Sequence, residues 1–404
     1  MLTLDPMLLP SWINASWLRR FRLKLHRWYE KNHRSLPWRD TRSAYAIWVS
    51  EIMLQQTQVA TVIPFFARFL KRFESVEALA NANEAEVLKY WEGLGYYRRA
   101  RQMHAAAQQI VARHQGIFPT TFDDVLALPG IGRYTAGAIC SFAYDQPTPI
   151  VEANTQRLYA RLLRLSEPLS TKESQSMLWS FAEEILPSKN RRITNQAVME
   201  LGSLICQPKP NCIACPLSEL CPTFSNGLQA EIPVPKKKMS YESRNEVALI
   251  IANSQKQYLI RQCGLNEWWA GLWDFPRFEF APSLEIDEHA KDIASKAKQI
   301  FGLACRIQAP LFSIKHSVTK YRISLNCYSA KLLKNPQSHT IQSTQKHSLL
   351  QSPQLQSPQL QSPQLQSQWV SLSDLESIPL SASGRKIVKQ LTVRASPWVS
   401  LSKT

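Results

Sequence analysis

With 404 residues, 44% of them hydrophobic, the chain is too long for one ordinary core, so we expect two or three domains. Its formal net charge of +17 favours a polyanionic partner, either nucleic acid or an acidic membrane surface. The sequence has no apolar run that would span a membrane, and its first residues do not have the pattern of a secretory signal, so we expect a cytoplasmic protein.

The first predicted helix, within residues 11–35, carries an apolar stripe beside a basic stripe, which suits a core helix with one solvated face. From residue 43 to about 205, helical patterns follow one another between glycine and proline breaks, with little alternation of period two. We therefore expect the first domain, residues 1–225, to be all-α.

Several polar side chains stand within the helical pattern at residues 50–59, Ser-Glu-Ile-Met-Leu-Gln-Gln-Thr-Gln-Val. If this stretch is one helix, Glu51, Gln55 and Gln58 lie along one face, because they are spaced at i, i+4 and i+7. Glutamine can pair with base edges or fill the gap left by an extruded base, so the face could contact DNA. The alternative is a solvated polar face on a core helix.

Residues 128–137, Leu-Pro-Gly-Ile-Gly-Arg-Tyr-Thr-Ala-Gly, join two helical patterns within about 122–144. Gly130 and Gly132 allow bare backbone N–H groups to approach an anion at the start of a helix. The pattern resembles a helix-hairpin-helix, which grips a DNA phosphate without reading sequence. An ordinary tight turn between packed helices is the alternative. The hairpin predicts the ligand and does not predict the reaction.

Four of the eight cysteines stand close together, with gaps of five, two and five residues. In a reducing compartment they are not expected to form a disulfide framework, so a metal site is the better interpretation. Both an iron–sulfur cluster and zinc accept four thiolates, and the spacing does not decide between them. The four are Cys206, Cys212, Cys215 and Cys221.

After the cysteines, a basic Pro/Lys linker at 226–243 precedes short β-like runs and one helical stretch, so residues 244–395 should form an α+β domain. Three copies of Gln-Ser-Pro-Gln-Leu fall inside an insertion at about 335–367, which has the composition of a disordered segment. Residues 396–404 are expected to be a tail. The β-like runs are 246–252, 257–261 and 321–328, and the helical stretch is about 287–301.

Together, the motifs at 36–39, 50–64, 91–97 and 128–137 and the four cysteines resemble those of MutY-type adenine DNA glycosylases. The resemblance is strong over about 28–224 and weaker over 240–395. It implies an all-α helix-hairpin-helix glycosylase domain with a [4Fe–4S] cluster loop at 206–221, followed by an α+β Nudix-like domain without a hydrolase role. It also implies a monomer that acts on double-stranded DNA with an A:8-oxoguanine or A:G mispair.

The resemblance assigns roles to individual residues. Glu51 is expected to protonate the leaving adenine, while Glu152, held by Asn154, supports the sugar cation. Tyr134 stands where the endonuclease III type has a Schiff-base lysine, so no amine nucleophile is expected and cleavage should stop at the abasic site. The expected DNA and lesion contacts are Arg39, Gln55, Gln56, Tyr96, Leu128, Gly130, Gly132, Thr319 and Lys320, and the expected cluster ligands are the four cysteines.

Elementary chemistry agrees with this division of roles. Adenine is a poor leaving group until it is protonated, so an acid must be held beside the base in a dry pocket that raises its pKa. The deoxyribose then becomes cationic, and a second, ionised carboxylate stabilises it or bonds to it, as in two-carboxylate glycosidases.

Three positions depart from the family pattern. Glu152 stands where an aspartate is usual, and a helix cap alone is the alternative role for it. The first cysteine gap is five residues where six are usual. Val318-Thr319-Lys320 replaces the Phe-Ser-His of some members, and an exposed β-turn is the alternative there. Two other functions stay open: an endonuclease III-like pyrimidine glycosylase with lyase activity, and a non-catalytic protein that binds DNA lesions.

Overall fold

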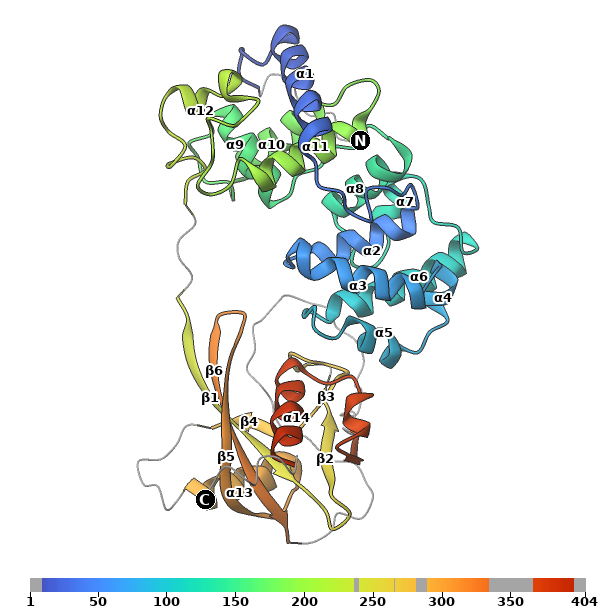
Figure 1. Ribbon diagram of the computed structural model, residues 1–404, viewed down its shortest axis with the longest axis vertical. Coiled ribbons are helices and arrows are strands. Elements are labelled where there is room, and N and C mark those ends of the chain that lie inside the picture. The colour runs from blue at the N-terminus through green and yellow to red at the C-terminus, as the bar shows by residue number, and fades with distance from the viewer. Residues whose placement is uncertain (1–8, 236–239, 265, 281–288, 334–365, 396–404) are drawn as a thin grey trace. The chain divides into compact units, whose positions relative to one another are not determined.

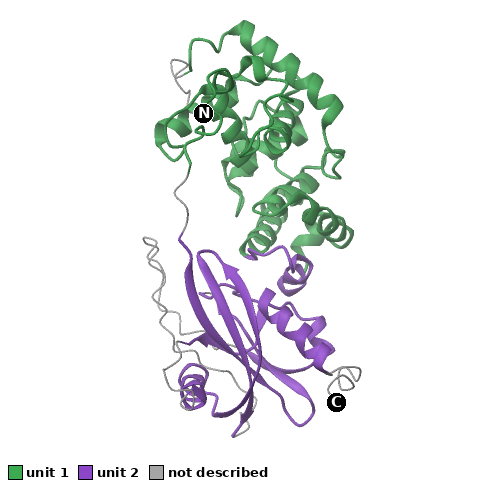
Figure 2. Ribbon diagram, turned by 60° about the vertical axis from the view of Figure 1, so that its left-hand side comes forward, with its two compact units in different colours: residues 1–82, 98–238 green, residues 83–97, 239–404 purple. Residues whose placement is uncertain are grey.

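The computed structural model describes residues 9–235, 240–264, 266–280, 289–333 and 366–395 (Figure 1). The three Gln-Ser-Pro-Gln-Leu repeats, the tail at 396–404 and the linker lysines at 236–238 are not among these residues. The predictions for them therefore lie outside the described part of the chain. Contacts divide the chain into two compact units (Figure 2). Unit 1 contains residues 1–82 and 98–238, and unit 2 contains residues 83–97 and 239–404.

The described residues of unit 1 form helices joined by loops, which confirms the predicted all-α half. No described helix of the chain is both long and apolar enough to cross a bilayer. The helices of unit 1 are α1 (Ala15–Asn32), α2 (Ala44–Leu54), α3 (Val59–Arg72), α4 (Val76–Ala80), α6 (Arg98–His114), α7 (Phe122–Leu126), α8 (Arg133–Tyr144), α9 (Ala153–Leu163), α10 (Lys172–Glu184), α11 (Arg191–Leu204), the 3₁₀ turn η2 (Ser218–Leu220) and α12 (Pro222–Ser225).

Helix α2 is a buried helix of unit 1. The Ser43 side chain caps its start by accepting a hydrogen bond from the Ala46 N–H, and the helix packs against α3, α6 and α8. Its sequence is apolar on all sides, which is typical of a buried helix, and every residue from Ala44 to Met53 is buried. Glu51 is therefore a carboxylate carried on an otherwise uncharged, buried helix.

The predicted helical face of Glu51, Gln55 and Gln58 is wrong, because α2 ends at Leu54. Gln55 is its C-cap residue, and Gln58 is the N-cap residue of α3. The cause lies elsewhere in the chain. The guanidinium of Arg99 donates to the carbonyls of Ile52 at 2.6 Å, Met53 at 3.2 Å and Gln55 at 2.5 Å, and so satisfies the last carbonyls of the helix.

Unit 2 is an α+β domain, as predicted. A four-stranded sheet has the order β4-β1-β6-β5, and a three-stranded sheet has the order β3-β2-β7. In the larger sheet β1 is parallel to β6 and antiparallel to β4. The elements are α5 (Glu84–Trp91), β1 (Glu242–Ile251), β2 (Gln257–Gln262), β3 (Trp273–Asp274), β4 (Arg277–Glu279), α13 (His289–Phe301), β5 (Cys305–Val318), β6 (Tyr321–Leu332), β7 (Ser367–Ser371), η3 (Asp374–Glu376) and α14 (Ala382–Ala395).

Strand β1 explains the layers of unit 2, because successive side chains of a strand point to opposite faces. Val247, Leu249 and Ile251 enter one hydrophobic cluster with residues of α13, whereas Ala248 and Ile250 enter a second cluster with residues of α14. The sheet therefore has a helix on each face, and the continuous apolar run of β1 follows from burial on both sides.

Candidate active site

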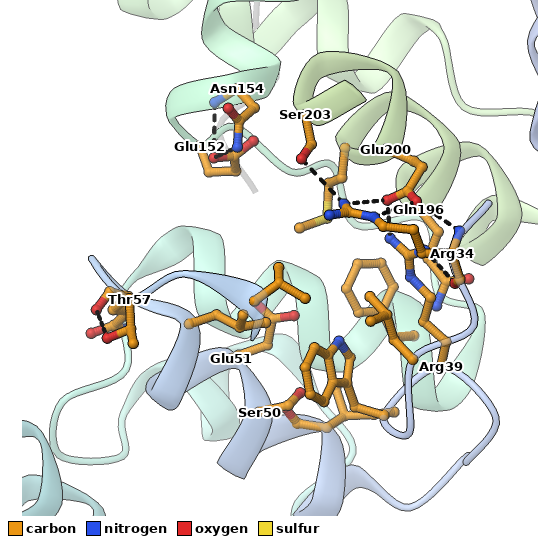
Figure 3. A pocket seen from close by; sticks show the side chains of 18 of the residues that line it. Arg34, Arg39, Ser50, Glu51, Thr57, Glu152, Asn154, Gln196, Glu200 and Ser203 are labelled. Carbon is orange, nitrogen blue, oxygen red and sulfur yellow. Dashed lines mark hydrogen bonds and ion pairs between the residues drawn. The ribbon is translucent and has the colours of Figure 1, made fainter. Parts of the chain in front are cut away.

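A cavity of about 460 Å³ opens in unit 1 (Figure 3). Its volume lies in the range of pockets that hold small ligands. The walls come from the segment before α2, from α2 itself and the loop after it, and from α8, α11 and the start of α9. Among the predicted site residues, the cavity brings together Arg39, Glu51, Gln55, Gln56, Tyr134, Glu152 and Asn154.

Glu51 is almost fully enclosed, with only 4% of its surface exposed. The hydroxyl of Tyr134, in the first turn of α8, donates to Glu51 Oε2 at 2.7 Å. Burial raises the pKa of Glu51 to about 7, although the Tyr134 hydrogen bond acts in the opposite direction. Burial beside Glu51 also raises the pKa of Tyr134, so the phenol keeps its proton. At neutral pH the carboxyl group of Glu51 can therefore hold a proton and donate it.

Glu152 forms the cap of α9 and lines the same cavity. Its Oε1 accepts from the Thr155 N–H at 2.8 Å and its Oε2 from the Asn154 N–H at 2.9 Å. The Asn154 side chain donates to Oε2 at 3.3 Å. Burial raises the pKa of Glu152, while these hydrogen bonds favour its ionised form. Glu152 therefore does cap the helix, as the alternative predicted. It also lines the cavity shown in Figure 3.

A row of hydrogen bonds runs from Glu152 to the first cysteine. Asn154 Oδ1 accepts from Arg157 Nη2 at 2.9 Å, and Arg157 Nε donates to the carbonyl of Cys206 at 2.6 Å. The neighbouring Arg161 donates to Cys206 Sγ at 3.3 Å. The cavity and the cysteine loop are therefore joined by directional contacts between charged side chains and backbone groups.

Glu200 of α11 is a cavity residue that the sequence analysis missed. Arg34 donates to both of its oxygens, each at 2.8 Å, and Arg39 Nη2 lies 2.6 Å from Oε2. Despite complete burial of the Glu200 side chain, these hydrogen bonds lower its pKa to about 2. Arg39, expected as a DNA contact, thus takes part in an ion pair on the wall. A lone glutamate in a helical pattern carries no signal for such a distant pairing.

The predicted hairpin is present between α7 and α8. Gly130 has φ +78°, and a Cβ there would approach Cβ of Gln102 to 2.7 Å, so glycine is required. Gly132 is the N-cap of α8, and a Cβ there would meet nothing within 4 Å, so the space beside this residue is open. Leu128 is buried and its carbonyl accepts from the Ile131 N–H, a position that shapes the turn.

The four predicted cysteine ligands line one small cavity beside α9. In the described part of the chain, however, no three histidine, cysteine or acidic side chains converge closely enough to hold a single metal ion. Four thiols around one cavity are compatible with a [4Fe–4S] cluster, which binds each cysteine at a different iron.

The other predicted lesion contacts belong to unit 2. Thr319 and Lys320 form the two-residue turn between β5 and β6, with φ +50° at Thr319, and Lys320 Nζ lies 2.6 Å from Glu242 Oε1. The β-turn alternative therefore describes their geometry. Tyr96 follows α5 with φ +48°, and 55% of its surface is exposed.

Comparison with known proteins identifies two family models in the chain. The model of the HhH-GPD superfamily of base excision DNA repair proteins matches residues 49–184, and a NUDIX domain model matches residues 247–390. The first match contains Glu51, the hairpin and Glu152, whereas the second contains the described sheets of unit 2 from β2 onward.

The curated relatives that are similar to this chain include three that are named adenine DNA glycosylase. The protein of Buchnera aphidicola subsp. Schizaphis graminum is 38% identical over 254 residues, which cover 62% of this chain and 73% of that protein. The Schizosaccharomyces pombe protein is 31% identical over 325 residues, covering 65% and 70% respectively. The Mus musculus protein is 42% identical over 215 residues, covering 50% and 42%.

Proposed function

The chain belongs to the adenine DNA glycosylases of base excision repair, and we propose that it removes adenine mispaired with 8-oxoguanine from duplex DNA. Adenine opposite guanine is the second substrate. The main support for the proposal is the state of Glu51. This acid is buried on α2 at the wall of the cavity, and burial raises its pKa to about 7. An acid in this state is what removal of a neutral purine requires.

In the proposed reaction, adenine is extruded from the duplex into the cavity, because the bond to be broken is inaccessible within the base stack. Glu51 donates its proton to a ring nitrogen of adenine. The base then leaves as a neutral molecule with the electron pair of the glycosidic bond, and the sugar carbon becomes cationic. Water adds to this carbon and loses a proton, which leaves an abasic site.

Glu152 is proposed to stabilise the sugar cation through charge. Both of its oxygens already accept backbone hydrogen bonds at the start of α9, which favours electrostatic support over a direct bond to the sugar. Tyr134 is held at the same cavity by Glu51 and helps to exclude water. The residues that line the cavity in the described structure include no lysine, which tells against a Schiff-base lyase.

The proposed DNA contacts lie at the hairpin and at turns. The open space beside Gly132, the N-cap of α8, supports a phosphate contact at the start of this helix. Gln55 and Gln56 lie in the loop at the cavity, where side chains can fill the space that the extruded base leaves. For the 8-oxoguanine side, we propose Tyr96, Thr319 and Lys320, which are supported by their positions on tight turns.

We propose a [4Fe–4S] cluster held by the four cysteines. It would fold the loop 206–221 and carry no step of the base-release reaction; the spread of the thiols around one cavity supports it. We propose that the protein acts as a monomer. The enzyme would work wherever the DNA is, which in a bacterium is the cytoplasm.

A panel of end-labelled duplexes tests the proposed substrate. Each would carry A opposite 8-oxoguanine, A opposite G, A opposite T or thymine glycol, and each would be analysed with and without alkali. We expect alkali-dependent breaks at A:8-oxoguanine and more slowly at A:G. Breaks without alkali, or at thymine glycol, would favour an endonuclease III-like enzyme, and intact A:8-oxoguanine duplexes would favour a non-catalytic binder.

A further inference from the structure

Within unit 2, an ion pair links the segment 83–97 to the C-terminal helix α14. Glu92 is the C-cap residue of α5, and Arg385 lies in the first turn of α14. The Arg385 guanidinium binds both oxygens of Glu92, through Nε to Oε1 and through Nη2 to Oε2 at 2.9 Å. This two-point arrangement constrains orientation as well as distance, which a single charge contact does not do.

Two backbone carbonyls also hold the guanidinium of Arg385 in place. Its Nη1 donates to the Leu375 carbonyl and its Nη2 to the Ile378 carbonyl, both at 2.8 Å. Only 29% of the Arg385 side chain and 14% of the Glu92 side chain are exposed, so solvent screens the pair less than it screens an ordinary surface pair. The guanidinium therefore presents a fixed binding surface to Glu92.

A second contact lies beside the first. Lys89, one helical turn before Glu92, donates to the carbonyl of Glu376, and its Nζ is 3.5 Å from Glu92 Oε2. The C-terminal end of α5 is thus fixed to η3 and α14 by two cations and one carboxylate. Figure 2 shows the segment 83–97 in the colour of unit 2.

The fixed helix end leads directly into the turn that carries Tyr96. Gly93, Gly95 and Tyr96 all have positive φ, at +107°, +69° and +48°, and the Gly95 carbonyl accepts from Trp91 Nε1 at 3.1 Å. A tyrosine with positive φ is strained, so its conformation must be held by neighbouring structure. Its ring is nevertheless largely exposed, which suits a side chain that acts on a partner outside the chain.

We propose that Arg385 is a positioning residue for Tyr96. By clamping Glu92, it fixes the turn from which Tyr96 enters the base stack beside the lesion, so the C-terminal domain aids discrimination through residues 92–96 as well as through its β5–β6 turn. This inference rests on the proposed role of Tyr96. A turn ordered before DNA binds does not have to be ordered during binding, which increases affinity and rate.

The test compares Arg385→Ala with Arg394→Ala, a matched control on α14 whose guanidinium contacts the Leu311 carbonyl instead of α5. Single-turnover adenine release would be measured at enzyme concentrations below saturation on A:8-oxoguanine duplexes. We expect Arg385→Ala to slow release about tenfold, the loss of a charged hydrogen-bonded contact, while Arg394→Ala matches the wild type. Glu92→Gln, a gentler change, should show a smaller loss in the same direction.

Epistasis separates positioning from a general loss of structure. In a Tyr96→Ala background, Arg385→Ala should cause no further loss, because Arg385 acts through Tyr96. A 2-aminopurine placed beside the 8-oxoguanine should brighten when the wild type unstacks it, and both Tyr96→Ala and Arg385→Ala should weaken that signal. The double charge exchange of Glu92→Arg with Arg385→Glu should recover part of it.

Each other outcome is decisive. Wild-type speed for Arg385→Ala when Tyr96→Ala is slow, or a full further loss from Arg385→Ala in the Tyr96→Ala background, would overturn the inference and leave the proposed function standing. Full activity of Tyr96→Ala would overturn the inference together with the proposed role of Tyr96. A wild type that releases no adenine would instead refute the proposed substrate itself.

Discussion

The hydroxyl of Tyr134 lies 2.7 Å from Oε2 of Glu51, inside the cavity of the helical unit. Two effects oppose each other there. The hydrogen bond favours the carboxylate, and burial favours the neutral acid; burial is the stronger effect, because the pKa of Glu51 rises to about 7. The tyrosine therefore limits a shift that burial creates, and keeps Glu51 able both to hold and to release a proton near neutral pH.

The first prediction concerns pH. If protonated Glu51 is the reactive form, the single-turnover rate of adenine release should be high below about pH 7 and fall as the pH rises through that value. The measurement is a rate profile from pH 5.5 to 9 with enzyme in excess. A rate that stays constant from pH 6 to 8.5 would show that Glu51 does not limit the reaction by losing its proton.

Tyr134→Phe gives the second prediction. The change removes a hydrogen bond that favours the carboxylate, so the pKa of Glu51 should rise further and the falling limb of the profile should move to higher pH. Tyr144→Phe, on the same helix but outside the cavity wall, is the control and should leave the limb in place. A limb that moves to lower pH in Tyr134→Phe would contradict this account of the pair.

Glu152 separates a structural role from a catalytic one. Glu152→Gln keeps one oxygen that can cap α9 and loses the other acceptor, so it should lower the unfolding free energy by about 1–2 kcal/mol, but it should slow base release about a hundredfold or more through loss of the charge. Glu152→Asp keeps both cap and charge and should remain much the faster of the two. Equal rates for the two variants would mean that Glu152 is only a cap.

Glu200 supports the cavity wall, and its prediction concerns stability. Glu200→Gln leaves Arg34 and Arg39 without their shared carboxylate and should cost about 2–3 kcal/mol at pH 7. The pKa of Glu200 is lowered from 4.5 to about 2, so its contribution is complete above 4.5 and is lost as the pH falls through that interval. Urea unfolding should therefore show a difference between variant and wild type that narrows below pH 4.5. A constant difference would contradict the ion pairing.

Features that depend only on residues close together in the sequence could be predicted. The helical half, the hairpin glycines and the close spacing of the cysteines are local patterns, and each has its counterpart in the fold. Glu51 was also singled out, as the acid in the polar stretch at residues 50–59, and the structure places it at the cavity. The catalytic assignments themselves came from the family resemblance and remain predictions.

Features that depend on distant residues were missed. No local signal ends α2 at Leu54, because the carbonyls at its end are satisfied by Arg99 of another helix. The ion pairs of Glu200 join residues more than 160 positions apart, and the clamp between Glu92 and Arg385 spans 293 positions. A single sequence indicates whether a segment tends to form a helix, a strand or a turn. It does not indicate which distant side chains will pair.

The measurement that tests the central claim most directly is release of free adenine by Glu51→Gln. The variant keeps the shape of the side chain and the oxygen that accepts from Tyr134, but has no proton to give. Wild type and variant would be bound to the same A:8-oxoguanine duplex, with binding checked by mobility shift and released adenine quantified by chromatography. We predict equal binding within a few-fold and a rate at least about a hundredfold lower for the variant. Adenine release by the variant at the wild-type rate would contradict the assignment of Glu51 as the acid.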